Sequence, residues 1–292
     1  MSFLSRVAGA PITWGVCEVP GWGVELPPSV VLSEMASLGL SATELGPTGY
    51  LGASPSDVRS ALAAHGMSLV GGFLPVVLHA SPSPDLSAAE AAIATLAGGG
   101  SEVVVLAADL GGSSYDARSE LTDAEWSNLV SNIAAVSAIA ESHGLRTTLH
   151  PHVGTAIESA ASVTRLLDSS DVPLCLDTGH LAIGGTDPLA LAQKAPERIG
   201  HVHLKDVNLT IAKSVAEGTT PFIDGVRAGM FTPLGEGDLD IAGIVSTLES
   251  AGYQGWYVLE QDTALTATPT SGTGPLADAH RSVTFLKSLA AA

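Results

Sequence analysis

The feature of this sequence that most constrains its fold is a series of short apolar runs, each followed by a side chain that can bind a metal ion or transfer a proton. The runs end at His150, Asp177, His203 and Glu260. Polar groups at the ends of successive strands meet only if the strands are parallel, because only then do those ends share one edge of the sheet. The pattern therefore indicates a parallel sheet with a shared site, and both point to an enzyme.

Short β-like runs alternate with longer helical stretches along nearly the whole chain. We expect strands at residues 7–14, 42–45, 68–73, 102–107, 146–150, 174–177, 199–204 and 255–260. We expect helices at residues 29–38, 55–64, 87–96, 123–142, 156–167, 188–194, 239–250 and 276–289. Several helices end at a glycine that precedes the next strand, as Gly39 and Gly144 do, and this repeated order predicts right-handed parallel crossovers.

Eight strands are the number that closes a barrel. A chain of 292 residues fits one (β/α)8 domain, which needs about 250 residues, and no proline-rich linker or charge block divides it. We therefore predict an α/β protein that forms a single (β/α)8 TIM barrel domain over residues 1–292. The longest stretch without periodicity, residues 207–237, follows the seventh strand. We expect it to be an inserted, lid-like loop over the carboxyl-terminal mouth, where active sites of this fold lie.

The charge balance argues against several classes of partner. Thirty acidic residues against 12 basic ones give a formal charge of −18, whereas nucleic acids and anionic membranes attract basic surfaces. Two cysteines are too few for a disulfide framework or a structural zinc cluster. The start of the chain has no signal-peptide apolar region, and no apolar run approaches the roughly 20 residues of a membrane span. We expect a cytoplasmic protein without nucleic-acid or membrane partners.

Two of the apolar runs carry paired functional groups. Asp177 and His180 follow one run, and His201 and His203 alternate within another. An aspartate after a strand can simply cap the next helix, but the histidine three residues later favours a site. Alternate residues of a strand point to the same side, so the two histidines lie together. A single histidine is more often a hydrogen-bonded core residue, whereas two beside carboxylates favour metal binding or catalysis.

The remaining candidates also have structural alternatives. Glu260 closes an apolar strand, where an unpaired carboxylate would cost several kcal/mol, so it needs a metal ion or a cationic partner such as Lys205. His150 and His152 flank a proline at the end of the fifth strand, and spacing alone does not say which is functional. Glu158 belongs to a capping-box pattern that would open the fifth helix, and we interpret it as structural.

Carboxylates and imidazoles gathered at adjoining strand ends form a mixed oxygen and nitrogen site for a divalent ion. Such ligands without thiolate suit Mn²⁺, Co²⁺, Fe²⁺ or Zn²⁺, whereas Mg²⁺ favours fewer imidazoles. This kind of site serves proton abstraction next to a carbonyl, because the ion stabilises the enediolate that results. The chemistry covers isomerases, epimerases and dehydratases of polyhydroxylated substrates.

Several motifs resemble the xylose-isomerase-like (β/α)8 superfamily. They are Asp-Thr-Gly-His at 177–180, Gly-His-Val-His-Leu-Lys-Asp at 200–206, Gly-Glu-Gly-Asp-Leu-Asp at 235–240 and Gly-Tyr-Gln-Gly-Trp-Tyr-Val-Leu-Glu at 252–260. Softer motifs at 10–15, 43–50, 150–155 and 231–235 resemble the inosose dehydratase group within it. The resemblance covers nearly the whole chain.

The resemblance implies roles for individual residues. Asp177, His203 and Glu260 fall on metal-ligand positions of the sugar epimerases in this superfamily. His150 stands where those epimerases have a glutamate that is both ligand and acid/base, so we expect it to be the fourth ligand. His152 is then a candidate acid/base, although the two histidines could exchange roles. The expected catalytic residues are His152, His180, Lys205 and Glu260, and the expected substrate contacts are Trp14, Glu44, His180 and Lys205.

The missing epimerase glutamate favours dehydration over two-base epimerisation. The resemblance therefore implies a metal-dependent dehydratase of a keto-inositol, which converts 2-keto-myo-inositol to a trihydroxycyclohexanedione through an enediolate. The metal would be Mn²⁺ or Co²⁺ before Fe²⁺, Zn²⁺ or Mg²⁺, and the protein could form a homo-oligomer. The alternatives are a ketose epimerase or isomerase, a 3-keto-sugar lyase, and, more remotely, a non-catalytic sugar-binding barrel. A nuclease-like branch of the fold would need a basic face, which the charge of −18 disfavours.

Overall fold

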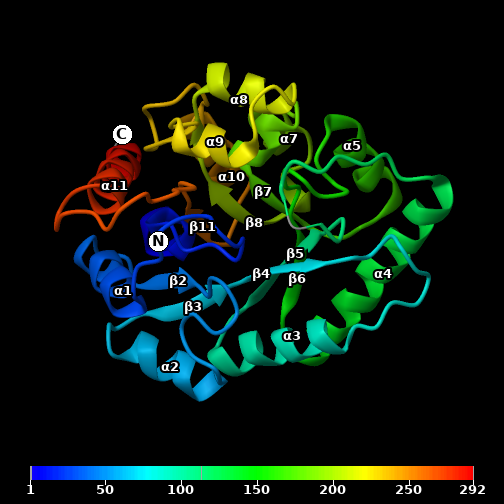
Figure 1. The fold of residues 1–292 in the computed structure, drawn as a ribbon, viewed down its shortest axis with the longest axis horizontal. Coiled ribbons are helices and arrows are strands. Elements are labelled where there is room, and N and C mark those ends of the chain that lie inside the picture. The colour runs from blue at the N-terminus through cyan, green and yellow to red at the C-terminus, as the bar shows by residue number, and fades with distance from the viewer. Residues whose placement is uncertain (1, 113, 292) are drawn as a thin grey trace.

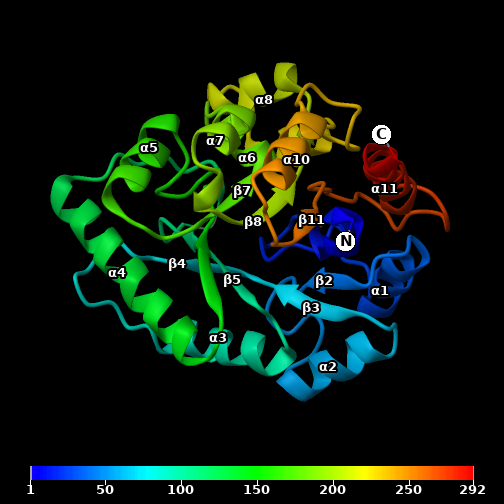
Figure 2. The ribbon, with the colours of Figure 1, turned by 180° about the vertical axis from the view of Figure 1, so that it is seen from behind.

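Parallel strands form a barrel surrounded by helices in the computed structural model, which describes residues 2–112 and 114–291 (Figures 1 and 2). The strand order is β3-β2-β1-β11-β8-β7-β6-β5-β4. The strands are β1 Val7–Gly9, β2 Ala42–Glu44, β3 Ser68–Gly71, β4 Phe73–Val76, β5 Val103–Ala108, β6 Arg146–Leu149, β7 Leu174–Asp177, β8 Ile199–Leu204 and β11 Tyr257–Leu259. All the pairings within this sheet are parallel.

The strands β3 and β4 are consecutive segments of one barrel strand, interrupted at Gly72. The N–H of Glu102 donates to the Val70 carbonyl at 3.3 Å, and the N–H of Val105 donates to the Gly72 carbonyl at 3.0 Å. Both halves therefore pair with the start of β5, which closes the ring. The predicted (β/α)8 barrel is confirmed, with the third and fourth labelled strands at one of its eight positions.

Helices cover the outside of the barrel. They are α1 Pro28–Ser37, α2 Pro55–Ala63, α3 Ser87–Gly99, α4 Asp123–Ser142, α5 Ala160–Ser169, α6 Thr178–Ile183, α7 Pro188–Lys194, α10 Ile241–Ser250 and α11 Pro275–Ala291. Capping boxes begin α2 at Ser54 and α4 at Thr122. The predicted glycine stop after α4 takes a left-handed conformation, with φ of 79° at Gly144, which a glycine adopts without strain.

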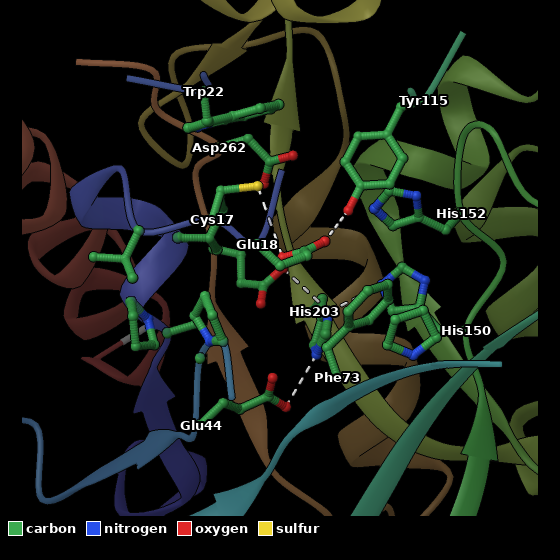
Figure 3. A pocket seen from close by; sticks show the side chains of 18 of the residues that line it. Cys17, Glu18, Trp22, Glu44, Phe73, Tyr115, His150, His152, His203 and Asp262 are labelled. Atoms are coloured by element: carbon green, nitrogen blue, oxygen red, sulfur yellow. Dashed lines mark hydrogen bonds and ion pairs between the residues drawn. The ribbon is translucent and has the colours of Figure 1, made fainter. Parts of the chain in front are cut away.

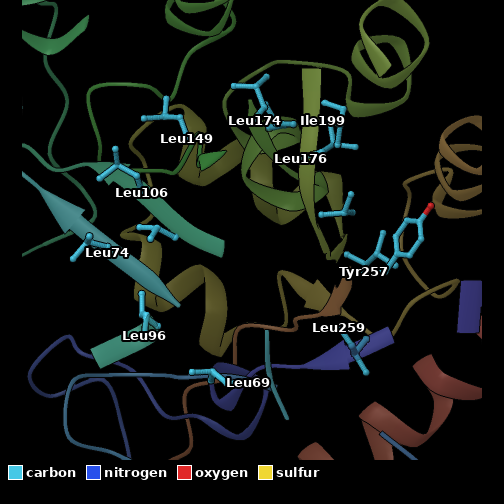
Figure 4. Close-up of a cluster of buried hydrophobic side chains, with 14 of the residues drawn as sticks. Leu69, Leu74, Leu96, Leu106, Leu149, Leu174, Leu176, Ile199, Tyr257 and Leu259 are labelled. Atoms are coloured by element: carbon cyan, nitrogen blue, oxygen red, sulfur yellow. The ribbon is translucent and has the colours of Figure 1, made fainter. Parts of the chain in front are cut away.

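The core lies between the strands and the helices and inside the barrel. Figure 4 shows buried leucines of several barrel strands that belong to one cluster, among them Leu69, Leu106, Leu149 and Leu176. Every residue of β5 is buried, as expected for a parallel strand covered on both faces. Within the described part of the chain, no helix is both long and apolar enough to cross a membrane.

Two expected elements differ from the sequence-based boundaries. The first strand ends at Gly9, and Pro11–Trp14 form a 3₁₀ helix instead, because Pro11 has no N–H to donate to a neighbouring strand. Helix α5 begins after the cap Ser159, whose hydroxyl accepts from the N–H of Ser162 at 3.2 Å. The expected capping box is therefore wrong: the Glu158 carboxylate pairs with Arg118 at 2.9 Å.

The stretch at 207–237 is folded rather than irregular. It contains α8 Leu209–Ala216 and α9 Phe222–Arg227, and β10 Phe231–Thr232 pairs antiparallel with β9 Asp206–Val207. The buried Asp206 carboxylate accepts from the N–H groups of Gly235, Gly237 and Leu239 at 2.8, 3.0 and 3.1 Å. One carboxylate therefore holds the end of this insertion against β9. Helices α8 and α9 lie above β7 and β8 in Figure 1.

Candidate active site

A pocket that opens to solvent lies at the carboxyl-terminal mouth of the barrel (Figure 3). Its lining includes Glu44, His150, His203, Lys205 and Glu260. These residues follow or end four different strands, which converge as the sequence pattern predicts. The position agrees with the general location of active sites in this fold.

Four candidate ligand atoms lie close together at the pocket. His150 Nε2 lies 3.3 Å from Asp177 Oδ2 and 3.1 Å from His203 Nδ1. His203 Nδ1 in turn lies 3.5 Å from Asp177 Oδ2 and 3.2 Å from Glu260 Oε2. Asp177, His203 and Glu260 lie close enough to hold one ion together, because metal–nitrogen and metal–oxygen bonds are about 2.0–2.2 Å, and His150 Nε2 lies beside two members of this group. The structure thus brings together the four residues expected to bind the metal.

The Lys205 ammonium group reaches the same carboxylates. Its Nζ lies 3.2 Å from Asp177 Oδ2, 3.0 Å from Glu260 Oε2 and 2.8 Å from Asp262 Oδ1. Burial alone would lower the pKa of Lys205, but Asp177, Asp262 and Glu260 together hold it well above its usual value. Lys205 is therefore charged, and it supplies part of the positive charge that these buried carboxylates require.

The two carboxylate oxygens of Asp177 have different partners. Oδ1 accepts the N–H of His180 at 2.8 Å and caps α6. Oδ2 is buried and makes no hydrogen bond of good geometry within the described residues, although it faces His150 and Lys205. Burial opposes ionisation, but Lys205 and the neighbouring histidines hold the pKa of Asp177 well below its usual value.

The donor set fits a divalent metal ion. Asp177, His203 and Glu260 form one of the buried groups of side chains that could hold an ion, and Asp177 Oδ2 is a buried acceptor without a proper hydrogen bond. Two imidazoles with two carboxylates suit the borderline ions from Mn²⁺ to Zn²⁺. His150 points its Nε2 into this group, whereas His152 does not belong to it.

His152 and His180 form a second pair beside the cluster. Their ring centroids are 3.7 Å apart, and His152 Nδ1 lies 2.7 Å from the Val153 carbonyl, which makes Nδ1 the protonated nitrogen. Burial, followed by the repulsion of neighbouring cations, lowers the pKa of both histidines well below the usual value. Both are therefore neutral near pH 7, and a neutral imidazole can accept a proton.

Aromatic side chains from distant parts of the chain surround this pair. The ring centroids of Tyr115 and His152 are 4.6 Å apart. Phe222 of α9 stacks on His180, with ring centroids 5.8 Å apart. The Tyr115 hydroxyl donates to the Glu18 carboxylate across the mouth (Figure 3). Trp22 packs against both Tyr115 and Phe222. The insertion at 207–237 and two barrel loops thus form an apolar wall over the histidines.

Other expected site residues lie in different environments. Glu44 lines the pocket and lies against His201 and His203, at 2.8 and 3.1 Å from their Nε2 atoms. Trp14 is fully buried, and its indole N–H donates to Glu34 at 2.7 Å. Trp14 therefore lies in the core and not among the pocket-lining residues.

Sequence reasoning missed Asp262 and Tyr115. Asp262 lines the pocket, and burial raises its pKa to about 6 even though Lys205 lowers it. Its position two residues after Glu260, beyond the end of a barrel strand, was a signal that it could face the mouth. Tyr115 lies in a long connection after β5, where no periodicity indicates which side chain turns inward.

Buried imidazoles and carboxylates at the carboxyl-terminal face of a (β/α)8 barrel define this chain as a barrel enzyme. The chain belongs to the family of xylose isomerase-like TIM barrels, which matches residues 32–289. It is similar to an inosose dehydratase of Geobacillus kaustophilus, with 33% identity over 270 residues that cover 88% of this chain and 87% of that protein. This family and this relative confirm the predicted resemblance and the prediction of an enzyme.

Solved structures show the same fold at lower sequence identity. An L-ribulose 3-epimerase superposes with a TM-score of 0.71 at 17% identity. The superposition covers 98% of this chain and 94% of the epimerase chain. A probable 3-DHS dehydratase, AsbF of Bacillus anthracis, superposes with a TM-score of 0.69 at 17% identity, covering 96% and 98%. At these identities the likeness concerns the barrel alone.

Proposed function

We propose that this protein is a metal-dependent hydro-lyase that removes water from a keto-inositol, converting 2-keto-myo-inositol to a trihydroxycyclohexanedione. The observation that carries the proposal is the convergence of His150, Asp177, His203 and Glu260 beside a neutral histidine pair. The similarity over 88% of the chain to an inosose dehydratase supports the choice of substrate. The pocket opens to solvent and is lined by His150, His203, Lys205 and Glu260, so a polyhydroxylated substrate can reach these side chains.

The four converging side chains would hold the ion, which we propose to be Mn²⁺ or Co²⁺. When bound, the ion would polarise the substrate carbonyl and stabilise negative charge on its oxygen. Lys205 would also stabilise negative charge on that oxygen, because its ammonium group lines the pocket and lies beside the same carboxylates. The apolar wall formed by Tyr115 and Phe222 packs against His152 and His180 and would limit their contact with water.

Dehydration needs one group that takes the α proton and one that gives a proton to the departing hydroxyl. His152 is proposed as the base, because its Nδ1 proton is directed at the Val153 carbonyl and its Nε2 is left as the acceptor. Loss of the α proton gives an enediolate, and its collapse expels the β-hydroxyl as water. His180 or Lys205 would supply the second proton, and Glu260 orients Lys205 at 3.0 Å. The enol that forms tautomerises to the dione.

One observation favours epimerisation or isomerisation of a ketose as the second candidate. Two-base epimerisation requires a second proton-transfer group, and Asp262 supplies a second pocket-lining carboxylate near Glu260. Asp262 Oδ2 lies 3.8 Å from His180 Nε2. The same enediolate would then be reprotonated without loss of hydroxyl.

Incubation with scyllo-inosose in deuterated buffer separates the two candidates. Protein loaded with Mn²⁺ is mixed with the substrate, and the reaction is followed by NMR and by the ultraviolet absorbance of the conjugated product. Appearance of the trihydroxycyclohexanedione, or of its conjugated enol, supports the dehydratase. Deuterium at the α carbon without water loss moves the enzyme to the epimerase class, and absence of exchange with any keto-inositol or ketose removes both.

A further inference from the structure

Glu44 lies directly behind one of the proposed metal ligands. It ends β2, across the barrel from β8, and its Oε1 lies 2.8 Å from His201 Nε2 and 3.1 Å from His203 Nε2. All three side chains are at least nine-tenths buried. Gly71 makes room for this arrangement, because a Cβ there would lie 3.0 Å from Glu44 Oε1.

The Glu44 carboxylate determines which ring nitrogen of each histidine carries the proton. A carboxylate oxygen accepts hydrogen bonds, and Glu44 Oε1 lies within hydrogen-bond distance of the Nε2 atoms of both His201 and His203. Both imidazoles therefore present Nε2–H to Glu44. The nitrogen of His203 that faces His150 and Glu260 is then Nδ1, at 3.1 and 3.2 Å.

We propose that Glu44 is a positioning residue of the metal centre: its carboxylate directs Nε2–H of His203 away from the cluster and aims Nδ1 at the ion. Carboxylate, imidazole and metal in series are a recurrent way of fixing the ring orientation and the basicity of a histidine ligand. His201 anchors Glu44 from the other side, at 2.8 Å. This inference rests on the metal site of the proposed function, but not on its substrate.

This role differs from the substrate contact expected of Glu44. Glu44 does line the pocket, so its second oxygen, Oε2, remains available for a substrate contact. A substrate contact would change KM and leave metal affinity untouched. A positioning role would change metal affinity in the absence of substrate.

The experiment titrates the metal-stripped protein with Co²⁺ alone, following heat by calorimetry and the d–d absorbance of the bound ion. Loss of such an outer partner typically weakens metal affinity by about 10–100-fold, so Glu44→Ala should raise the Kd of Co²⁺ by that factor and alter the absorbance. Glu44→Gln keeps an acceptor oxygen at Oε1, and it should restore most of the affinity and the wild-type spectrum. Glu18→Ala is the matched control, since Glu18 also lines the pocket but bonds to Tyr115, and its Kd should match that of the wild type.

The outcomes separate this inference from the proposed function. Tight Co²⁺ binding with the same Kd and spectrum in Glu44→Ala overturns the positioning role, and a raised KM in that variant assigns Glu44 to the substrate. Failure of the wild type to bind Co²⁺, Mn²⁺ or Zn²⁺ removes the metal site and this inference with it. Circular dichroism and melting temperature of each variant show that it is folded, and a folded Glu44→Gln with wild-type affinity supports the inference even if Glu44→Ala fails to fold.

Discussion

Replacing Lys205 by methionine should destabilise the metal-free protein and strengthen its binding of metal. The ammonium group lies within 3.2 Å of three buried carboxylates, those of Asp177, Glu260 and Asp262. Removing one partner of a buried ion pair costs about 3–5 kcal/mol, because the other charge is left without compensation. Methionine has similar length and no charge, so the packing of the side-chain stem is retained.

That cost translates into a measurable shift in melting temperature. For domains of roughly 150–250 residues, 1 kcal/mol corresponds to about 2–4 °C, so a cost of about 3–5 kcal/mol predicts that Lys205→Met lowers the melting temperature of metal-free protein by roughly 6–20 °C at pH 8. An ion at 1,000 times its Kd adds about 4 kcal/mol, so excess Mn²⁺ should recover most of the loss. The Kd of Mn²⁺ should fall, because the ion no longer shares Asp177 Oδ2 and Glu260 Oε2 with the ammonium group.

Calorimetric scans and Mn²⁺ titrations of the metal-free variant test both effects. Lys194→Met is the matched control, because Lys194 is exposed on α7 and its loss should change neither quantity. A melting temperature equal to that of the wild type, or weaker Mn²⁺ binding in Lys205→Met, would refute the view that the ammonium group and the ion compete for the same oxygens.

Three further predictions concern other parts of the site. Chelation of the metal should abolish activity and lower the melting temperature, and a variant with Asp177→Asn and His203→Ala should retain no ion by elemental analysis; full activity in metal-free protein would contradict both. Phe222→Ala should reduce turnover and also cost about 3–5 kcal/mol by denaturant titration, because Phe222 is fully buried in the aromatic wall; unchanged turnover with reduced stability would make the insertion purely structural and not a lid. Cys175, which is buried, should resist iodoacetamide at pH 7.5 until the protein is unfolded, because burial raises the pKa of its thiol to about 11; rapid labelling of Cys175 in native protein, measured by mass spectrometry, would be inconsistent with that burial.

The barrel fold and the proximity of the candidate ligands could be predicted from the sequence. Both follow from the alternation of apolar runs with helical stretches and from the parallel direction of the strands. The strand ends at Asp177, His203 and Glu260 are set by apolar runs that the sequence shows directly, and a parallel barrel leaves them no other edge to occupy. Lys205 was expected beside them because it follows the same strand as His203. These features could be predicted because they depend on the local sequence or on the topology of the barrel.

The features that could not be predicted depend on which side chains, distant in the sequence but close in the fold, compete for the same hydrogen-bond or ion-pair partner. Segment 155–158 has the residues of a capping box, but Glu158 finds Arg118, 40 residues earlier, and Ser159 caps the helix instead. The contact between Glu44 and His201 joins residues 157 positions apart. No spacing rule expresses such a pairing, because it depends on which side chains the closed barrel brings face to face.

The two interpretations of Asp177, as a helix cap and as a site residue, were posed as alternatives, but the structure shows that one side chain can serve both. Its Oδ1 accepts from His180 N–H and fixes the carboxylate plane, and this leaves Oδ2 directed at His150 and Lys205. His203 divides its nitrogens in the same way, with Nε2 towards Glu44 and Nδ1 towards Glu260. In each case the contact that looks structural removes the rotational freedom of a buried polar group. The atom that remains is then held in place before any ligand arrives, and that preorganisation is what a metal or a catalytic site requires.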